Sequence, residues 1–152
     1  MAKLEYLMTY RADLKPAVAV GAVPSGSRQI FDVTGGTFQG PRLKGKLHAS
    51  GADWLLVGND GVGRLDVRGT LETDEGALIY LQYHGVLQMN EAFVSAISAG
   101  GETGFGDVYF MTQPRFETGA ESYAWLNSVV AVGEGRILPG AVEYRVYEVV
   151  ND

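Results

Sequence analysis

Polar and apolar residues alternate with a period of two along several segments of this chain, and this alternation limits its fold more than any other feature. In residues 42–49, apolar or small residues occupy every second position, with charged residues or histidine between them. Successive side chains of a β-strand point to opposite faces, so the pattern predicts a strand with one buried and one solvated face. The other strand-like segments are residues 4–12, 28–33, 53–57, 65–70, 77–87, 107–112, 128–132 and 142–149.

Glycine-rich turns separate these segments. Glycine accounts for 21 of the 152 residues, about twice its average share of roughly 7%. The segments Gly58-Asn59-Asp60-Gly61 and Thr73-Asp74-Glu75-Gly76 predict tight turns, because glycine supplies the positive φ angles that such turns require. The second turn is expected to join two strands into a hairpin.

These patterns predict one all-β domain over residues 1–152, with about eight or nine antiparallel strands and at most one short helix. The helix is expected at residues 90–97, with Asn90 as its N-cap and Gly100-Gly101 as its end. A sheet of this size curls, and closure removes its exposed edges, so a single closed barrel is favoured over a two-sheet sandwich.

Composition excludes several classes of site. The chain has a net charge of −6, no cysteine and two histidines, His48 and His84. An acidic chain is a poor ligand for nucleic-acid phosphates, and two isolated histidines do not predict a metal site. The basic stretch Arg42–Lys46 fits the solvated face of a strand better than an anion-binding patch. No apolar run is long enough to span a membrane, and the cytoplasm is the expected location.

Nucleotide and nucleophile motifs are missing as well. Residues 100–106 are rich in glycine but lack the Lys-Ser/Thr pair that ends a phosphate-binding loop. There is no Gly-x-Ser-x-Gly elbow for a serine nucleophile. We therefore expect no metal and no cofactor, and the candidate chemistry rests on carboxylates, Arg, Tyr, Trp and Asn.

Four residues are the catalytic candidates. Asp66 and Arg68 are two positions apart on one expected strand, so their side chains share a face. That face is either a solvated rim or the barrel interior. In the interior a carboxylate moves a proton while the guanidinium binds developing oxyanion charge. Asp53 and Glu117 are the other two candidates for proton transfer.

Aromatic and amide residues are the candidates for substrate binding. Tyr123, Trp125 and Asn127 lie within a short stretch after Pro114, and such a mixture is typical of a pocket lining. Trp54 and Tyr80 complete the set. A core role for Trp125 is the favoured alternative, because tryptophan is large and usually buried.

Several motifs resemble those of one protein family. They are Thr34–Phe38 with Gly40-Pro41, Gly51–Trp54, Leu71–Tyr80, Pro114–Gly119, Tyr123–Asn127, Val132-Gly133 and Tyr144–Glu148. In this order they cover nearly the whole chain and resemble the bacterial and fungal family filed as domain of unknown function 3237. The resemblance implies a small closed β-barrel similar to the allene oxide cyclase and dirigent barrels. It also implies an activity like that of fungal members, which are associated with cofactor-free cyclisation in natural-product pathways.

Three functions remain open at this point. The first is a cofactor-free isomerase, lyase or cyclase acting on a small oxygenated substrate that is aromatic or unsaturated. The second is a barrel that carries a small apolar ligand without changing it. The third is a structural barrel filled by side chains, since the interior of an eight-stranded barrel is only just wide enough to fill. A small molecule is the expected partner, and a homo-oligomer is compatible with the exposed aromatics and with the long segment after Gln88.

Overall fold

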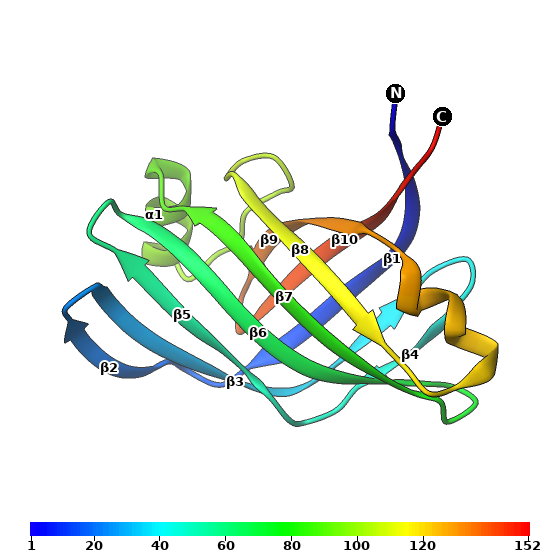
Figure 1. Ribbon diagram of the computed structural model, residues 1–152. Helices are drawn as coiled ribbons and strands as arrows, with labels where there is room; N and C mark the ends of the chain where they lie inside the picture. Colours follow the sequence, from blue (N-terminus) through cyan, green and yellow to red (C-terminus); the bar gives the residue numbers. More distant parts are fainter.

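The computed structural model describes residues 1–152, which form ten antiparallel strands, one α-helix and one 3-10 helix (Figure 1). The prediction of an all-β chain with one short α-helix is confirmed, although the strands number ten rather than eight or nine. The elements are β1 (Lys3–Leu14), β2 (Val18–Val23), β3 (Gly26–Gln39), β4 (Lys44–Leu47), β5 (Ala52–Gly58), β6 (Val62–Thr73), β7 (Leu78–Gln88), α1 (Glu91–Ser98), β8 (Phe110–Glu117), η1 (Glu121–Ser128), β9 (Ala131–Leu138) and β10 (Ala141–Val150).

The strand pairings close into a ring. The order runs β1, β10, β9, β8, β7, β6, and then β6 pairs with both β4 and β5, which in turn pair with β3. The β1–β3 ladder, from Thr9–Gln39 to Leu14–Val33, closes the circle. Because β4 and β5 occupy one position in succession along β3, the ring has eight positions, and β2 hangs from β3 outside it.

Alternation along each strand separates an inner from an outer face. In β6, Leu65, Val67 and Leu71 are buried, whereas Arg64 and Arg68 are exposed. The side chains of Leu65, Val67 and Leu71 join the one hydrophobic core cluster of the molecule. The period of two therefore determines which residues enter the ring.

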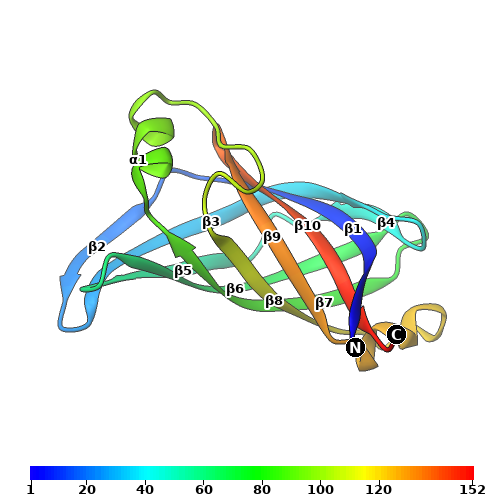
Figure 2. The same cartoon turned by 90° about the horizontal axis from the view of Figure 1, so that it is seen from above.

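The two ends of the ring differ (Figure 2). The 3-10 helix η1 covers one end, where its Leu126 is only 1% exposed and packs into the core. The α-helix α1 stands at the other end and has no buried residue. Asn90 caps α1 as expected, because its Oδ1 accepts a hydrogen bond from Phe93 N at 2.9 Å.

Several predicted strand boundaries are wrong. β3 does not stop at Gly35-Gly36, because both glycines adopt positive φ and carry the strand through a bend to Gln39. β8 continues through Pro114 to Glu117, and its ladder with β9 includes only Met111 and Thr112. The strand expected at residues 128–132 begins at Ala131, because residues 121–128 form η1.

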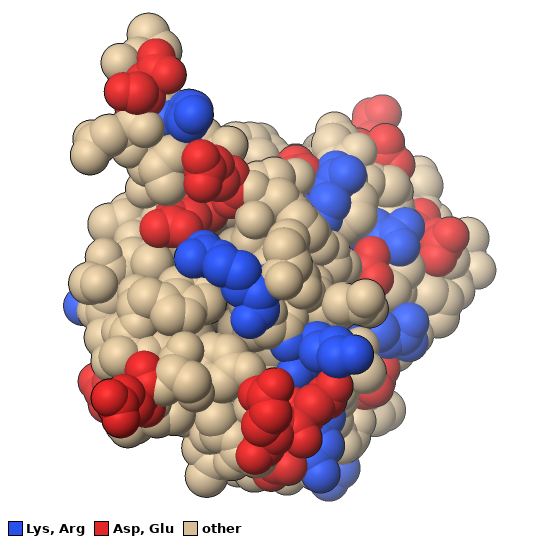
Figure 3. All heavy atoms as spheres, turned by 90° about the vertical axis from the view of Figure 1, so that its right-hand side faces the viewer, with Lys and Arg blue, Asp and Glu red and all other residues tan.

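The basic stretch near β4 is neutralised by carboxylates. Arg42 Nη2 lies 2.9 Å from Glu148 Oε2, and Lys44 Nζ lies 3.7 Å from Asp74 Oδ2. Lys46 is likewise paired, with Glu72. Figure 3 shows acidic and basic side chains interleaved on the face at the η1 end of the molecule. None of the helices has the length and apolar character needed to cross a membrane.

Candidate functional site

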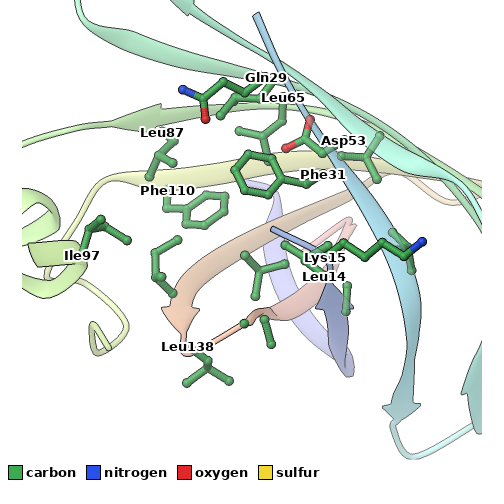
Figure 4. A pocket seen from close by; sticks show the side chains of 18 of the residues that line it. Leu14, Lys15, Gln29, Phe31, Asp53, Leu65, Leu87, Ile97, Phe110 and Leu138 are labelled. Atoms are coloured by element: carbon green, nitrogen blue, oxygen red, sulfur yellow. The ribbon is translucent and has the colours of Figure 1, made fainter. Parts of the chain in front are cut away.

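A cavity of about 760 Å³ occupies the half of the ring that faces α1. It is lined by 25 residues, of which 19 are hydrophobic. Phe93 and Ile97 of α1 line it, together with Lys15 after β1 and Leu138 at the end of β9. Figure 4 shows the side chains of Ile97, Lys15 and Leu138. This volume lies within the range of about 300–1,000 Å³ that is usual for small-molecule sites. The hypothesis of a structural barrel required side chains to fill the whole interior, and the cavity shows that they do not.

The cavity ends on a layer of aromatic rings. Tyr83, Tyr144 and Phe110 line it, whereas the inward residues one step further along the strands, such as Leu81 and Val146, do not. The Phe110 and Tyr144 rings meet edge to face with centroids 5.3 Å apart. Beyond this layer the interior is filled by core side chains, among them Leu81, Val146, Phe116 and Leu126, so the cavity occupies only one side of the ring.

Three tyrosines of this layer pack against one another. The Tyr10 ring stacks on the Tyr144 ring at a centroid distance of 5.4 Å, and Tyr83 meets both rings edge-on. The Tyr10 and Tyr83 hydroxyl oxygens are 3.2 Å apart, within hydrogen-bond distance. Burial raises the pKa of Tyr10 to about 12 and raises the pKa values of Tyr83 and Tyr144 well above the ordinary value. All three phenols therefore remain protonated and able to donate a hydrogen bond at neutral pH.

Asp53 is the one carboxylate that lines the cavity. It lies on the inner face of β5, near Phe31 and Leu65 (Figure 4). Its Oδ1 accepts a hydrogen bond from the backbone N–H of Asp66 at 3.2 Å. Its ionisation raises the pKa of Tyr10 and Tyr144, so the carboxylate interacts electrostatically with the tyrosine layer.

Burial dominates the acidity of Asp53. Loss of hydration raises the pKa of Asp53 to about 7. The hydrogen bond from Asp66 N opposes that shift, the negative charge of Asp66 adds to it, and the Arg28 guanidinium lowers it slightly. A carboxyl group with this pKa is present in both protonation states near neutral pH, which suits a general acid or base.

The remaining polar groups of the cavity lie around this carboxylate and at the mouth. Ser27 and Gln29 belong to the inner face of β3, and Figure 4 shows the Gln29 amide and the Asp53 carboxylate on the same side of the cavity. Lys15 is exposed at the rim. The arrangement thus joins an apolar chamber to one titratable acid, a few amide and hydroxyl groups, and one peripheral ammonium group.

The Asp66–Arg68 pair lies outside the ring. Both residues belong to the outward phase of β6, with Arg68 exposed and Asp66 opposite His84 of β7. The Asp66 Oδ1 atom is 3.6 Å from His84 Nε2. The interior position considered for this pair is therefore wrong, because Leu65 and Val67 take the inward positions on either side of Asp66.

Glu117, Tyr80 and Trp54 also point outward. Tyr80 and Glu117 are cross-strand partners on β7 and β8, and both are exposed. Trp54 follows Asp53 directly on β5 and is 37% exposed. Since neighbouring residues of a strand face opposite sides, the Trp54 side chain must point out of the ring when that of Asp53 points into it. None of the three lines the cavity.

The three candidates of η1 lie at the opposite end of the ring. Tyr123 is buried, and its hydroxyl donates to Glu75 Oε2 at 2.5 Å. Trp125 is partly buried against the hydrophobic core, and the guanidinium carbon of Arg42 lies 3.8 Å from the centroid of its ring. Asn127 bonds both the N–H and the C=O of Thr118, so it fixes the turn between β8 and η1. The packing role thus applies to Trp125, and none of these residues reaches the cavity.

The tyrosine layer and Gln29 were missed as site residues. Tyr10 and Tyr144 stand in the apolar phase of their strands, which places them inside the ring. A tyrosine at an inward-facing strand position indicates a possible site, because a buried tyrosine hydroxyl needs a hydrogen-bond partner. Gln29 stands in a β3 segment without clean alternation, so no sequence signal identified it. No group of three or more His, Asp or Glu side chains is arranged to hold a metal ion.

Comparison with known proteins gives consistent relatives. A protein named UPF0311 protein from Rhodopseudomonas palustris is 27% identical over 146 residues, which is 96% of this chain and 95% of that protein. Another UPF0311 protein, from Clostridium acetobutylicum, is 29% identical over 124 residues and covers 82% of this chain and 78% of its own length.

Solved structures agree with this relationship. A β-barrel-like protein from Acinetobacter baumannii is 36% identical, with a TM-score of 0.84 over 99% of this chain and 97% of its own. A conserved protein of unknown function from Rhodopseudomonas palustris has a TM-score of 0.91 at 28% identity, over 99% of each chain. An enzyme from Penicillium herquei shares the fold alone, with a TM-score of 0.71 at 22% identity over 98% of this chain and 95% of its own. The sequence model of one family matches residues 2–149, and the chain therefore belongs to the family described as Protein of unknown function (DUF3237).

Proposed function

We propose that this protein is a cofactor-free acid–base enzyme, an isomerase, lyase or cyclase, acting on a small and mostly apolar oxygenated substrate. The observation that carries the proposal is the Asp53 carboxyl group, which lines an apolar cavity of about 760 Å³ and has a pKa raised to about 7. Burying a carboxylate in such surroundings lowers stability, so a functional reason for keeping it there is expected.

Proton transfer by Asp53 needs no external reagent. In the isomerase case, the ionised carboxylate takes a proton from a carbon next to a substrate carbonyl, and the C–H electron pair moves into an enolate. The protonated Asp53 then returns the proton to another carbon of the same molecule. Atoms and electrons balance without an oxidant or reductant. A positioned acid–base group contributes about 10²–10⁴-fold to such a step.

The tyrosine layer is proposed to stabilise the oxygen that gains charge. Tyr83 and Tyr144 line the cavity and keep their protons at neutral pH, so each is able to donate a hydrogen bond to a ligand oxygen. In an apolar site such a donor stabilises an oxyanion more than it does in water. Arg68 lies on the outer face of β6, so it does not bind the oxyanion in this proposal.

The experiment is a turnover screen with matched variants. Phenols, enones and small hydroxy acids are incubated with the wild-type protein, Asp53→Asn and Trp125→Ala, and products are followed by NMR. We expect at least one product with wild type, loss of about 10²-fold or more in Asp53→Asn, and unchanged turnover in Trp125→Ala. Full activity of a folded Asp53→Asn protein would sink the assignment.

A carrier is the second candidate, and the apolar lining favours it. Nineteen of the 25 cavity residues are hydrophobic, which suits retention of an apolar ligand without chemistry. In the same screen, binding without any product would favour the carrier.

Outside the cavity, Val18 and Val20 of β2 are more than half exposed. We propose that they form contacts in a homo-oligomer, and light scattering checks this proposal.

A further inference from the structure

The cavity contains one acidic side chain and no buried cation. Among its lining residues only Asp53 and Lys15 carry a charge. Lys15 is exposed at the rim, where its ammonium group is hydrated. A ligand seated between Asp53 and the tyrosine layer therefore meets one carboxyl group and neutral donors.

The groups packed around Asp53 supply little positive charge. From β1 and β10, Tyr10 and Tyr144 are neutral phenols. From β6, Asp66 adds a negative charge outside the ring. From β3, Arg28 has only a slight effect on Asp53, and its Nη1 donates to the carbonyl oxygen of Trp54 at 2.7 Å.

The β7 contribution is also neutral. Tyr83 is buried, and its hydroxyl lies 3.2 Å from the hydroxyl of Tyr10. Two negative charges in a poorly hydrated space repel each other strongly, so one of the two groups takes up a proton. The tyrosines stabilise one oxyanion by hydrogen bonds, but they carry no positive charge that would neutralise a second negative charge beside Asp53.

We propose, building on the cavity as the ligand site, that it accommodates a single negative charge shared between Asp53 and the ligand. A weakly acidic hydroxyl compound, an enol or a phenol, enters neutral and donates its O–H to the ionised Asp53. A carboxylate of the same shape enters only with uptake of one proton. The substrate class is therefore neutral hydroxyl or enolisable compounds rather than carboxylic acids.

The matched probes are 2-naphthol and 2-naphthoate, which share one ring system and differ in charge. Binding to the wild-type protein is measured by titration calorimetry at pH 8 in phosphate and in Tris, whose ionisation enthalpies differ. The difference in heat between the buffers counts the protons taken up. We expect no uptake with 2-naphthol and about one proton per molecule of 2-naphthoate. Between pH 8 and 9 the Kd of 2-naphthoate should rise about tenfold.

Two variants test whether Asp53 is the group that takes up the proton. Asp53→Asn should abolish proton uptake and make the Kd of 2-naphthoate independent of pH between 7 and 9. Glu117→Gln, which removes an exposed carboxylate on the outer face of β8, should behave as wild type.

Three results would overturn the proposal. They are 2-naphthoate binding to wild type without proton uptake, uptake that persists in Asp53→Asn, and failure of both probes to bind a folded wild-type protein. Calorimetry reports binding alone, so the proposed catalysis stands or falls separately on turnover by Asp53→Asn.

Discussion

The backbone N–H of Asp66 donates a hydrogen bond to Oδ1 of Asp53 across 3.2 Å, while the two carboxyl groups point to opposite faces of the β5–β6 ladder. The bond fixes one oxygen of Asp53 and leaves the other free for a ligand. It also stabilises the ionised form of Asp53, although burial outweighs it and the pKa of Asp53 is about 7. A backbone donor thus orients the proposed acid–base group, and no side chain is needed for this purpose.

Stability should depend on pH through Asp53. Its pKa is about 7 in the folded protein, whereas the ordinary pKa of an aspartate side chain is 3.8. The folded state therefore disfavours the ionised form, and the free energy of unfolding falls as pH rises from about 4 to about 7. The full shift corresponds to about 4 kcal/mol. We expect about 2 kcal/mol, because part of the Asp53 side chain stays exposed and the solvent there reduces the cost of the charge.

Asp53→Asn should remove this dependence. An asparagine oxygen still accepts the Asp66 N–H, and no charge is buried above pH 7. Urea unfolding at pH 5, 7 and 9 checks the prediction, with the variant about 2 kcal/mol more stable than wild type at pH 9. Parallel curves for the two proteins across this range would contradict the buried-acid interpretation.

Loss of the Tyr10 hydroxyl should destabilise the fold. Tyr10→Phe removes the partner of the Tyr83 hydroxyl at 3.2 Å, and the loss of one buried hydrogen bond costs about 0.5–1.5 kcal/mol. The double variant Tyr10→Phe/Tyr83→Phe should lose less than the sum of the two single losses, because it removes both polar groups. A double-mutant cycle by urea unfolding measures the coupling, and strictly additive losses would show that the hydroxyls do not interact.

Removal of a ring from α1 should weaken ligand binding. Phe93 lines the cavity from α1, whereas Val94 is exposed and does not. Phe93→Ala should raise the Kd of 2-naphthol about tenfold, since about 1–2 kcal/mol of apolar contact is lost. Val94→Ala is the matched control and should leave the Kd unchanged. Equal affinities for wild type, Phe93→Ala and Val94→Ala would place α1 outside the ligand site.

Close strand packing should make Gly45 intolerant of a side chain. A Cβ at Gly45 of β4 would collide with the backbone carbonyl oxygen of Glu72 and lie 2.8 Å from the Cα of Thr73. We expect Gly45→Ala to lose at least about 2 kcal/mol, because the backbone of β6 must shift. Gly119 has open space around it, so Gly119→Ala should change stability by less than about 0.5 kcal/mol. Thermal unfolding of both variants compares them directly.

The alternation of residues determined the fold class and which side chains enter the ring. Leu65 and Val67 are inside for the same reason that Asp66 and Arg68 are outside, and Tyr10 and Tyr144 follow the same rule. Asn90 and the glycines after it determined the place of α1. These properties depend on residues that are close together in the sequence, so a local sequence pattern is sufficient to predict them.

Only the tertiary structure decided where the ring is hollow. Asp53 stands beside Trp54 in a short segment without clean alternation, and pairing with β6 settles which of the two points inward. Tyr83 lies 73 residues from Tyr10, and closure of the ring brings their hydroxyls together. The cavity, and with it the raised pKa of Asp53, arises because strands far apart in sequence enclose a space that no single strand specifies.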